Sequence, residues 1–261
     1  MGPLALEQAA RAAEQAADRA RAEILPRFRR TRVDTKRDGS PVTEADLAAE
    51  RAIREELRRA FPEFGVLGEE FGQEGARSGP CWVVDPIDGT IAFSRGIPLF
   101  STLIALLEDG EPVLGLIDLP ALGERYIGWK GAGVRRNGTP VRVSQETDLR
   151  RAVISHGDPF CFEQFGLRHT FERMARELPM LRGYTDAFGH ALVIGGGVGA
   201  MLDVSLNVWD AAATQILVPE AGGRCITLPP RDGKIGLLFG SPALVAQLEG
   251  WLRPASVDAT R

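Results

Sequence analysis

Nine residues, WVVDPIDGT at positions 82–90, constrain the fold of this 261-residue chain more than any other segment. The apolar residues at 82–84 predict a buried strand. Pro86 and Gly89 predict that the backbone turns directly after that strand. The segment therefore indicates a core strand that delivers polar residues to a turn.

The polar residues at this turn are two acids followed by a Gly-Thr pair. Asp85 and Asp88 stand three residues apart, so both carboxylates can point at one hard cation such as Mg²⁺. Gly89 and Thr90 would open the next helix, whose unpaired N–H groups favour a phosphate. The same letters also fit a plain surface turn behind a core strand, and the rest of the chain has to decide between these interpretations.

Composition places the chain among ordinary globular proteins, with 44% hydrophobic and 25% charged residues. Lys plus Arg total 31 against 35 for Asp plus Glu, so no basic excess points to a nucleic-acid partner. The cysteines Cys81, Cys161 and Cys225 are too few and too widely spaced for a zinc site or a disulfide framework. With no long apolar run and no signal-peptide pattern, we expect a cytoplasmic protein without a membrane partner.

Two helices are predicted in the N-terminal part of the chain. Residues 4–25 are rich in alanine at helical spacing, which predicts a helix with a close-packing face. A second helix is predicted over residues 44–61, with Thr43 as its N-cap and Asp46 three residues later. Pro62 would end it.

Strands dominate the next part. Alternating and apolar runs predict strands at 99–107, 113–118 and 125–129, with turns at 109–110 and 137–138. We expect these strands to form an antiparallel sheet covered by the two preceding helices.

The pattern changes again in the second half of the chain. It predicts a strand at 153–155, a helix at 162–177, a Gly-rich apolar segment at 191–201 and a helix at 210–221. We therefore expect two lobes, 1–148 and 149–261, that pack into one unit because no low-complexity linker separates them.

Two further acids stand where an element begins or ends. Glu69 follows the apolar pair at 66–67, and Asp210 precedes three alanines at 211–213. Taken alone, Glu69 is explained as surface charge and Asp210 as a helix N-cap.

The combination is more specific than either acid. The chain carries, in order, KRDGSPVTEAD (36–46), GEE (68–70), DPIDGT (85–90), WDAAA (209–213) and EAGG (220–223). This series resembles the inositol monophosphatase superfamily of Mg²⁺-dependent phosphatases over nearly the whole chain. The resemblance implies a layered αβαβα sandwich of the sugar-phosphatase type, of mixed α+β and α/β character.

The resemblance also assigns roles by motif position. It implies that Asp85 bridges two metals, that two or three Mg²⁺ ions bind per site, and that Thr90, hydrogen-bonded to Asp46, orients the attacking water together with Glu69. The N–H groups of Gly89 and Thr90 would hold phosphate oxygens. The implied metal ligands are the side chains of Glu69, Asp85, Asp88 and Asp210 and the carbonyl of Ile87.

No Cys, Ser or His stands in a recognisable nucleophile motif, which favours direct attack on phosphorus by metal-activated water without a phosphoenzyme. The three histidines, His156, His169 and His190, show no ligand spacing, and only His190 is expected near the pocket.

Within the superfamily, residues 98–128 and 183–210 are most similar to histidinol-phosphate phosphatases. That subgroup implies hydrolysis of L-histidinol phosphate to L-histidinol in histidine biosynthesis. By position, Asp203 would contact the organic part of the substrate, Asp186 and Ala187 would line the same pocket, and Asp210 would also face the substrate. The family resemblance further implies a homodimer.

Other functions stay open at this point. An inositol-1-phosphatase is the first alternative, and a catalytically silent relative that binds a phosphorylated metabolite is another, although no metal carboxylate is lost. A 3′-phosphoadenosine phosphatase or fructose-1,6-bisphosphatase is less favoured because the chain lacks room for added elements.

Overall fold

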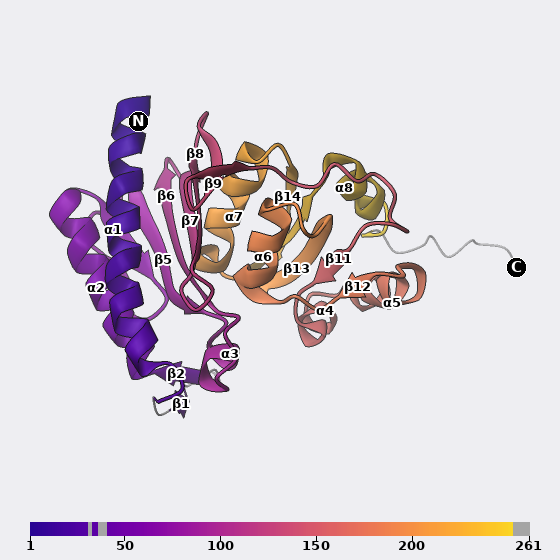
Figure 1. Cartoon of the computed structure of the whole chain (residues 1–261), viewed down its shortest axis with the longest axis horizontal. Helices are drawn as coiled ribbons and strands as arrows, with labels where there is room; N and C mark the ends of the chain where they lie inside the picture. The colour runs from indigo at the N-terminus through magenta and orange to yellow at the C-terminus, as the bar shows by residue number, and fades with distance from the viewer. Residues whose placement is uncertain (31–32, 36–40, 253–261) are drawn as a thin grey trace, which may run out of the picture.

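The protein is described here by a computed structural model that covers residues 1–30, 33–35 and 41–252. Residues 36–40, the first part of the KRDGSPVTEAD motif, lie outside the described residues. The chain forms five layers, helix, sheet, helix, sheet and helix, which succeed one another along the long axis of the molecule (Figure 1). The predicted αβαβα sandwich is thereby confirmed.

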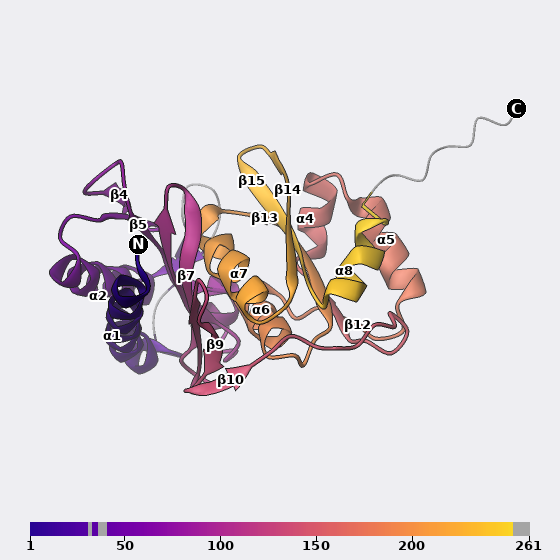
Figure 2. The same ribbon diagram turned by 90° about the horizontal axis from the view of Figure 1, so that it is seen from above.

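Helices α1 (Pro3–Arg27) and α2 (Glu44–Ala60) form the first layer and pack side by side (Figure 2). The α1 face is made of fully buried alanines, whose small side chains let the two helices approach closely. Thr43 caps α2 as predicted: its hydroxyl accepts from Ala45 N at 3.1 Å and its own N–H donates to Asp46 Oδ2 at 2.8 Å. Before α2, the short strands β1 (Val33–Thr35) and β2 (Pro41–Thr43) pair antiparallel.

The second layer is an eight-stranded sheet in the order β10-β9-β8-β7-β6-β5-β3-β4. Helix α3 (Thr90–Ser94) lies in the connection between two of its strands. The strands are β3 (Gly65–Gly68), β4 (Gly72–Glu74), β5 (Cys81–Asp88), β6 (Ser101–Glu108), β7 (Glu111–Leu119), β8 (Glu124–Trp129), β9 (Gly133–Arg136) and β10 (Thr139–Val141).

The strands predicted at 99–107, 113–118 and 125–129 pair antiparallel, as expected, but the sheet as a whole is mixed. Strand β3 runs parallel to β5, with Gly68 opposite Val84, while the other pairs are antiparallel. Parallel neighbours end at the same edge of a sheet. The residues that follow β3 therefore lie beside the carboxyl end of β5.

The remaining three layers come from the second half of the chain (Figure 1). Helices α6 (Asp186–Ile194) and α7 (Val208–Glu220) lie between the two sheets. The second sheet has the order β12-β11-β13-β15-β14, formed by β11 (Ile154–His156), β12 (Leu181–Arg182), β13 (Ala200–Leu206), β14 (Arg224–Arg231) and β15 (Lys234–Gly240). Helices α4 (Pro159–Gln164), α5 (Arg168–Glu177) and α8 (Pro242–Glu249) cover its outer face.

Alternation along β13 shows how the layers are joined. Met201 packs into the central core between the sheets, whereas Ala200 and Leu202 pack under the outer helices. The central core also contains Leu103 of the large sheet, so apolar residues of both halves meet there. The expected lobe boundary at 148/149 falls between β10 and β11. Both expected lobes contribute residues to the central core, and the division into two lobes stays a prediction.

Two local predictions are wrong. The helix expected over 162–177 is broken into α4 and α5, because Gly166 adopts a left-handed φ of 74° that a continuing helix does not allow. Pro86 does not turn the chain, since β5 continues to Asp88 and the turn comes at Gly89.

The three cysteines are free thiols, as expected. In the described part of the chain, no helix is long and apolar enough to cross a membrane.

Candidate active site

Strand β5 brings Asp85 and Asp88 to the edge of the large sheet. Residues three apart point to opposite faces of a regular strand. Here the pairing with β6 shifts between Asp85 and Asp88, so the two side chains come to the same side. Asp85 Oδ1 accepts from Ile87 N at 3.0 Å, which fixes the backbone within this irregular stretch.

Gly89 and Thr90 start α3, as predicted. Gly89 has a φ of 81°, and a Cβ there would lie 3.2 Å from the carbonyl oxygen of Leu99, so both conformation and space require glycine. The Thr90 hydroxyl donates to the Ile87 carbonyl at 2.9 Å.

Asp210 reaches the same edge from helix α7. It is the third residue of that helix, and its Oδ2 accepts from the Asn207 backbone N–H at 2.7 Å and from the Asn207 side chain at 3.1 Å. The interpretation of Asp210 as an N-cap is wrong, because the N-cap is Asn207 and Asp210 is the third residue of the helix, whose carboxylate accepts from the N-cap backbone. The same carboxylate is a member of the acid cluster. One carboxylate oxygen each from Asp85, Asp88 and Asp210 lies within 4.8 Å of the others.

The fourth acid, Glu69, follows β3 and is placed by the parallel pairing. Its backbone N–H donates to Val84 O at 3.3 Å, directly before Asp85. Its carboxylate raises the pKa of Asp85, second only to the effect of burial. The GEE and DPIDGT motifs therefore converge although 15 residues of sequence separate these acids.

The electrostatics of the cluster favour a positive charge beside it. Burial, followed by neighbouring carboxylates, raises the pKa of Asp85 and of Asp88 well above the usual range. Burial also raises the pKa of Asp210 to about 6. Several buried acids that share one space are stabilised in their charged form only by a cation.

Asp46, at the start of α2, is almost fully buried. Its Oδ2 accepts from the backbone and hydroxyl of Thr43, and its Oδ1 is buried without a hydrogen-bond partner among the described residues. Burial raises the pKa of Asp46, and the Glu69 carboxylate adds to this. The hydrogen bond between Thr90 and Asp46 that the resemblance implies is not formed in the described part of the chain, because the Thr90 hydroxyl turns to Ile87 instead.

The two acids that the sequence predicts to face the substrate come from the second half of the chain. Asp186 begins α6, with a φ of 58° that aspartate tolerates better than most residues, and Asp203 lies on β13. Burial and then the Asp203 carboxylate raise the pKa of Asp186 to about 6. Ala187 N donates to Asp88 Oδ2 at 2.7 Å, which ties α6 to the acid cluster.

A cavity of about 260 Å³ joins these groups. Every predicted site residue except Asp46 lines it: Glu69, Asp85, Ile87, Asp88, Gly89, Thr90, Asp186, Ala187, Asp203 and Asp210. The structure thus places residues of the GEE, DPIDGT and WDAAA motifs around one cavity, together with Asp186, Ala187 and Asp203.

The same cavity is lined by residues that the sequence predictions missed, among them Asp158, Cys161, Ser205 and Asn207. Asn207 could have been found as the N-cap of a capping box with Asp210 three residues later. His190, the histidine expected near the pocket, lies in the wall: its Nε2 is 3.1 Å from Asp203 Oδ2 and its Nδ1 is 2.7 Å from the Thr214 hydroxyl.

The donor set fits a hard divalent cation. All the acids at the cluster offer oxygen, which Mg²⁺ prefers over the nitrogen and sulfur ligands of zinc sites. The unpartnered Oδ1 of Asp46 and the raised pKa values of the cluster acids also fit a positive charge at this place.

Comparisons with known proteins agree with this geometry. The model of the inositol monophosphatase family matches residues 5–254. A histidinol-phosphatase of Streptomyces coelicolor is 41% identical over 247 residues, which cover 89% of this chain and 90% of the relative. An inositol monophosphatase structure from Zymomonas mobilis superposes with a TM-score of 0.82 at 32% identity, covering 94% of this chain and 98% of that chain.

A relative from Thermotoga maritima named fructose-1,6-bisphosphatase/inositol-1-monophosphatase is 38% identical over 184 residues, 70% of this chain and 69% of the relative. Since those shares are nearly equal, the relative is of similar length, and chain length does not separate these activities. The motifs, the fold and the family match agree with one another, and the chain belongs to the inositol monophosphatase family, a family of metal-dependent phosphatases.

Proposed function

We propose that this phosphatase uses Mg²⁺, with two or three ions bound at the cavity edge where β3, β5 and α7 meet. Bound Mg²⁺ would neutralise the charge of a phosphate monoester, lower the pKa of a water molecule and stabilise the leaving alkoxide. The proposed ligands are the carboxylates of Glu69, Asp85, Asp88 and Asp210 and the carbonyl of Ile87, all of which line the cavity.

The protein groups around these ligands have separate tasks. Gly89 and Thr90 stand at the start of α3, where backbone N–H groups have no partner within the helix and can donate to phosphate oxygens. The Thr90 hydroxyl oxygen can accept from a water while its proton stays on Ile87 O. Asp46 Oδ1 has no hydrogen-bond partner among the described residues and can accept a proton, and we assign Asp46, Thr90 and Glu69 to orienting the attacking water.

We propose L-histidinol phosphate as the substrate. The observation that carries this is the pair Asp186 and Asp203, two acids that line the same cavity as the metal ligands. Burial, followed by repulsion from the Asp203 carboxylate, raises the pKa of Asp186 to about 6. An ammonium group, or a protonated imidazole, placed between them would remove this repulsion, whereas a neutral polyol would not.

An inositol-1-phosphatase is the second candidate. The metal cluster and the phosphate-facing N–H groups would serve inositol 1-phosphate equally well, and the relatives include proteins named for both activities. Only the groups that face the organic part can separate the two substrates. Asp186 and Asp203 favour the cationic one.

The deciding experiment is phosphate release from a panel of monoesters at saturating Mg²⁺. The panel contains histidinol phosphate, inositol 1-phosphate, fructose 1,6-bisphosphate and a 3′-phosphoadenosine phosphate. We expect the highest kcat/KM for histidinol phosphate. A higher kcat/KM for inositol 1-phosphate would overturn the substrate assignment and leave the metal-phosphatase assignment standing.

We also propose a cytoplasmic homodimer with no nucleic-acid or membrane partner. Apolar side chains near the cavity mouth support the dimer: Ile91 is 65% exposed and Ile97 is 45% exposed, and both line one apolar cavity of about 500 Å³. Light scattering after size-exclusion chromatography should give twice the chain mass of 28.3 kDa. A mass of one chain at micromolar concentration would refute the dimer.

A further inference from the structure

Glu69 is the one proposed carboxylate ligand that sits on a short hairpin. It follows β3 and precedes β4, and β4 is the edge strand of the sheet, with three residues and only one neighbour. A turn at such an edge is held by few ladder hydrogen bonds. A contact with another element also holds the turn that carries Glu69.

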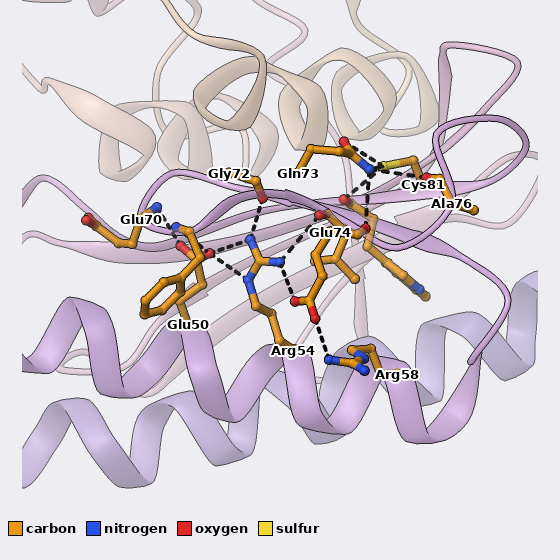
Figure 3. A network of polar contacts seen from close by, with 12 residues as sticks. Glu50, Arg54, Arg58, Glu70, Gly72, Gln73, Glu74, Ala76 and Cys81 are labelled. Atoms are coloured by element: carbon orange, nitrogen blue, oxygen red, sulfur yellow. Dashed lines mark hydrogen bonds and ion pairs between the residues drawn. The ribbon is translucent and has the colours of Figure 1, made fainter.

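The contact comes from Glu50 of helix α2, whose side chain is fully buried beneath the turn (Figure 3). Glu50 Oε2 accepts from Glu70 N at 2.7 Å, and its Oε1 accepts from Phe71 N at 3.2 Å. Gly68 leaves the room for this carboxylate, since a Cβ there would lie 2.1 Å from Glu50 Oε1. Glu50 thus holds the two backbone N–H groups that directly follow Glu69.

Arg54, one helical turn later, contacts both Glu50 and strand β4 (Figure 3). Its Nε donates to Glu50 Oε1 at 2.8 Å and its Nη2 donates to Gly72 O at 2.6 Å, across the start of β4. Its Nη1 lies 3.2 Å from Glu74 Oε2, and Arg58 donates to the other oxygen of Glu74 at 2.6 Å. The planar guanidinium of Arg54 therefore links the buried Glu50 to strand β4, which follows the turn.

A stabilising role alone does not explain this arrangement. Replacing a buried ion pair by well-packed apolar residues is often neutral or stabilising, so the pair is weak evidence for stability. The pair of Glu50 and Arg54 instead fixes the position of the turn. Two backbone N–H groups and one carbonyl next to Glu69 are bound by its side chains. The same face of α2 carries Asp46, four residues before Glu50. One helix therefore sets the positions of Asp46 and Glu50 together.

We infer that Glu50 and Arg54 are positioning residues that hold Glu69 in place for the metal. The inference rests on the metal site proposed above. Neither side chain lines the cavity, so both act through the turn at residues 69–71. Outer groups that orient a ligand typically change metal affinity by about 10- to 100-fold when they are replaced.

The test compares Glu50→Gln with a matched control, Glu56→Gln. Glu56 is on the same helix, is also buried, and pairs with Arg19 at 3.1 Å and with Arg59, none of which touches the hairpin. The measurements are the Mg²⁺ concentration that gives half the maximal thermal shift, the Mg²⁺ dependence of phosphate release, and the Tm in EDTA. Glu50→Gln should raise the half-saturating Mg²⁺ concentration about 10- to 100-fold, while Glu56→Gln leaves it within about twofold.

Each outcome decides something. If the wild type shows no thermal shift with Mg²⁺, the proposed metal site fails and the inference falls with it. If the wild type responds and Glu50→Gln has an unchanged half-saturation, or both variants shift equally, the positioning role is refuted while the metal site stands. If Glu50→Gln does not fold, Arg54→Lys decides by the same measurements, since a lysine keeps a charge beside Glu50 but cannot also reach Gly72 and Glu74.

Discussion

The backbone N–H of Ala187 donates to Asp88 Oδ2 at 2.7 Å, which joins helix α6 of the middle layer to the end of strand β5. Ser101 Oγ donates to the same oxygen at 2.9 Å. One oxygen of Asp88 is therefore held by two donors, one from each half of the chain. The acid cluster therefore forms only when the middle helices α6 and α7 pack against the large sheet.

The first prediction concerns the metal. Because the cluster acids are buried together, Mg²⁺ binding should stabilise the folded state, by about 2.7 kcal/mol when the free ion is at 100 times its Kd. Differential scanning fluorimetry in EDTA and in increasing Mg²⁺ measures this, with KCl at matched ionic strength as the control. Phosphate release should stop in EDTA and return with Mg²⁺. Full activity in excess EDTA would contradict the metal site.

The second prediction concerns pH. The folded-state pKa values of Asp210 and Asp186 are raised to about 6 from an ordinary value of 3.8. A group with a raised folded-state pKa contributes stability below its unfolded pKa, and that contribution is lost as the pH rises through the folded pKa. Metal-free protein should therefore lose stability between about pH 4 and 7, and the thermal shift caused by Mg²⁺ should grow over the same range.

The control for this pH dependence is Asp210→Asn. Its amide cannot ionise, so the slope of Tm against pH in EDTA should be smaller than in the wild type. A Tm that rises steadily from pH 4 to 7 in EDTA, for both proteins, would contradict the assignment of the raised pKa values.

The third prediction concerns two of the proposed ligands, Asp88 and Asp210. Changing either to Asn keeps an oxygen for the hydrogen bonds to Ala187 or Asn207 but removes a charge from the cluster. Turnover should fall by orders of magnitude, while the Tm in EDTA should stay equal or rise because repulsion is relieved. Asp109→Asn, in an exposed turn with φ 53°, is the matched control and should leave kcat unchanged.

Steady-state kinetics at saturating Mg²⁺ measure these variants. If Asp88→Asn and Asp210→Asn both kept more than roughly a tenth of the wild-type kcat, a loss below about 1.4 kcal/mol, the site would be wrong.

The fourth prediction concerns Asp203. We expect Asp203→Asn to lower kcat/KM for histidinol phosphate relative to p-nitrophenyl phosphate, by about 1–3 kcal/mol for a direct, desolvated contact. An aryl phosphate has no cationic group, so its kcat/KM controls for damage to the metal site. Equal losses on both substrates would show that Asp203 supports the structure of the cavity wall, for example through its contact with His190, and does not select the substrate.

Local sequence determined much of the fold and of the candidate site. Alanine spacing and the Thr43 cap predict α1 and α2 to within a few residues, because helix periodicity and capping depend only on near neighbours. Three of the five motifs, GEE, DPIDGT and WDAAA, contain every metal ligand proposed here. The family resemblance implies that these residues converge, and the structure shows that they line one cavity.

Tertiary structure decided what depends on contacts between distant segments. The parallel pairing of β3 with β5 carries no local pattern, yet it is what places Glu69 beside Asp85. Phe162 and Phe165 pack in the core under the second sheet on one side of the break at Gly166, and helix periodicity alone does not predict that contact.

The partners of buried polar groups were decided in the same way. Thr90 bonds to Ile87 and not to Asp46, and Glu50 finds its donors in a turn 20 residues away. A sequence fixes which donors and acceptors exist, but which of them pair depends on how layers close, because an unpaired buried group costs about 1–3 kcal/mol and any geometry that satisfies it is favoured.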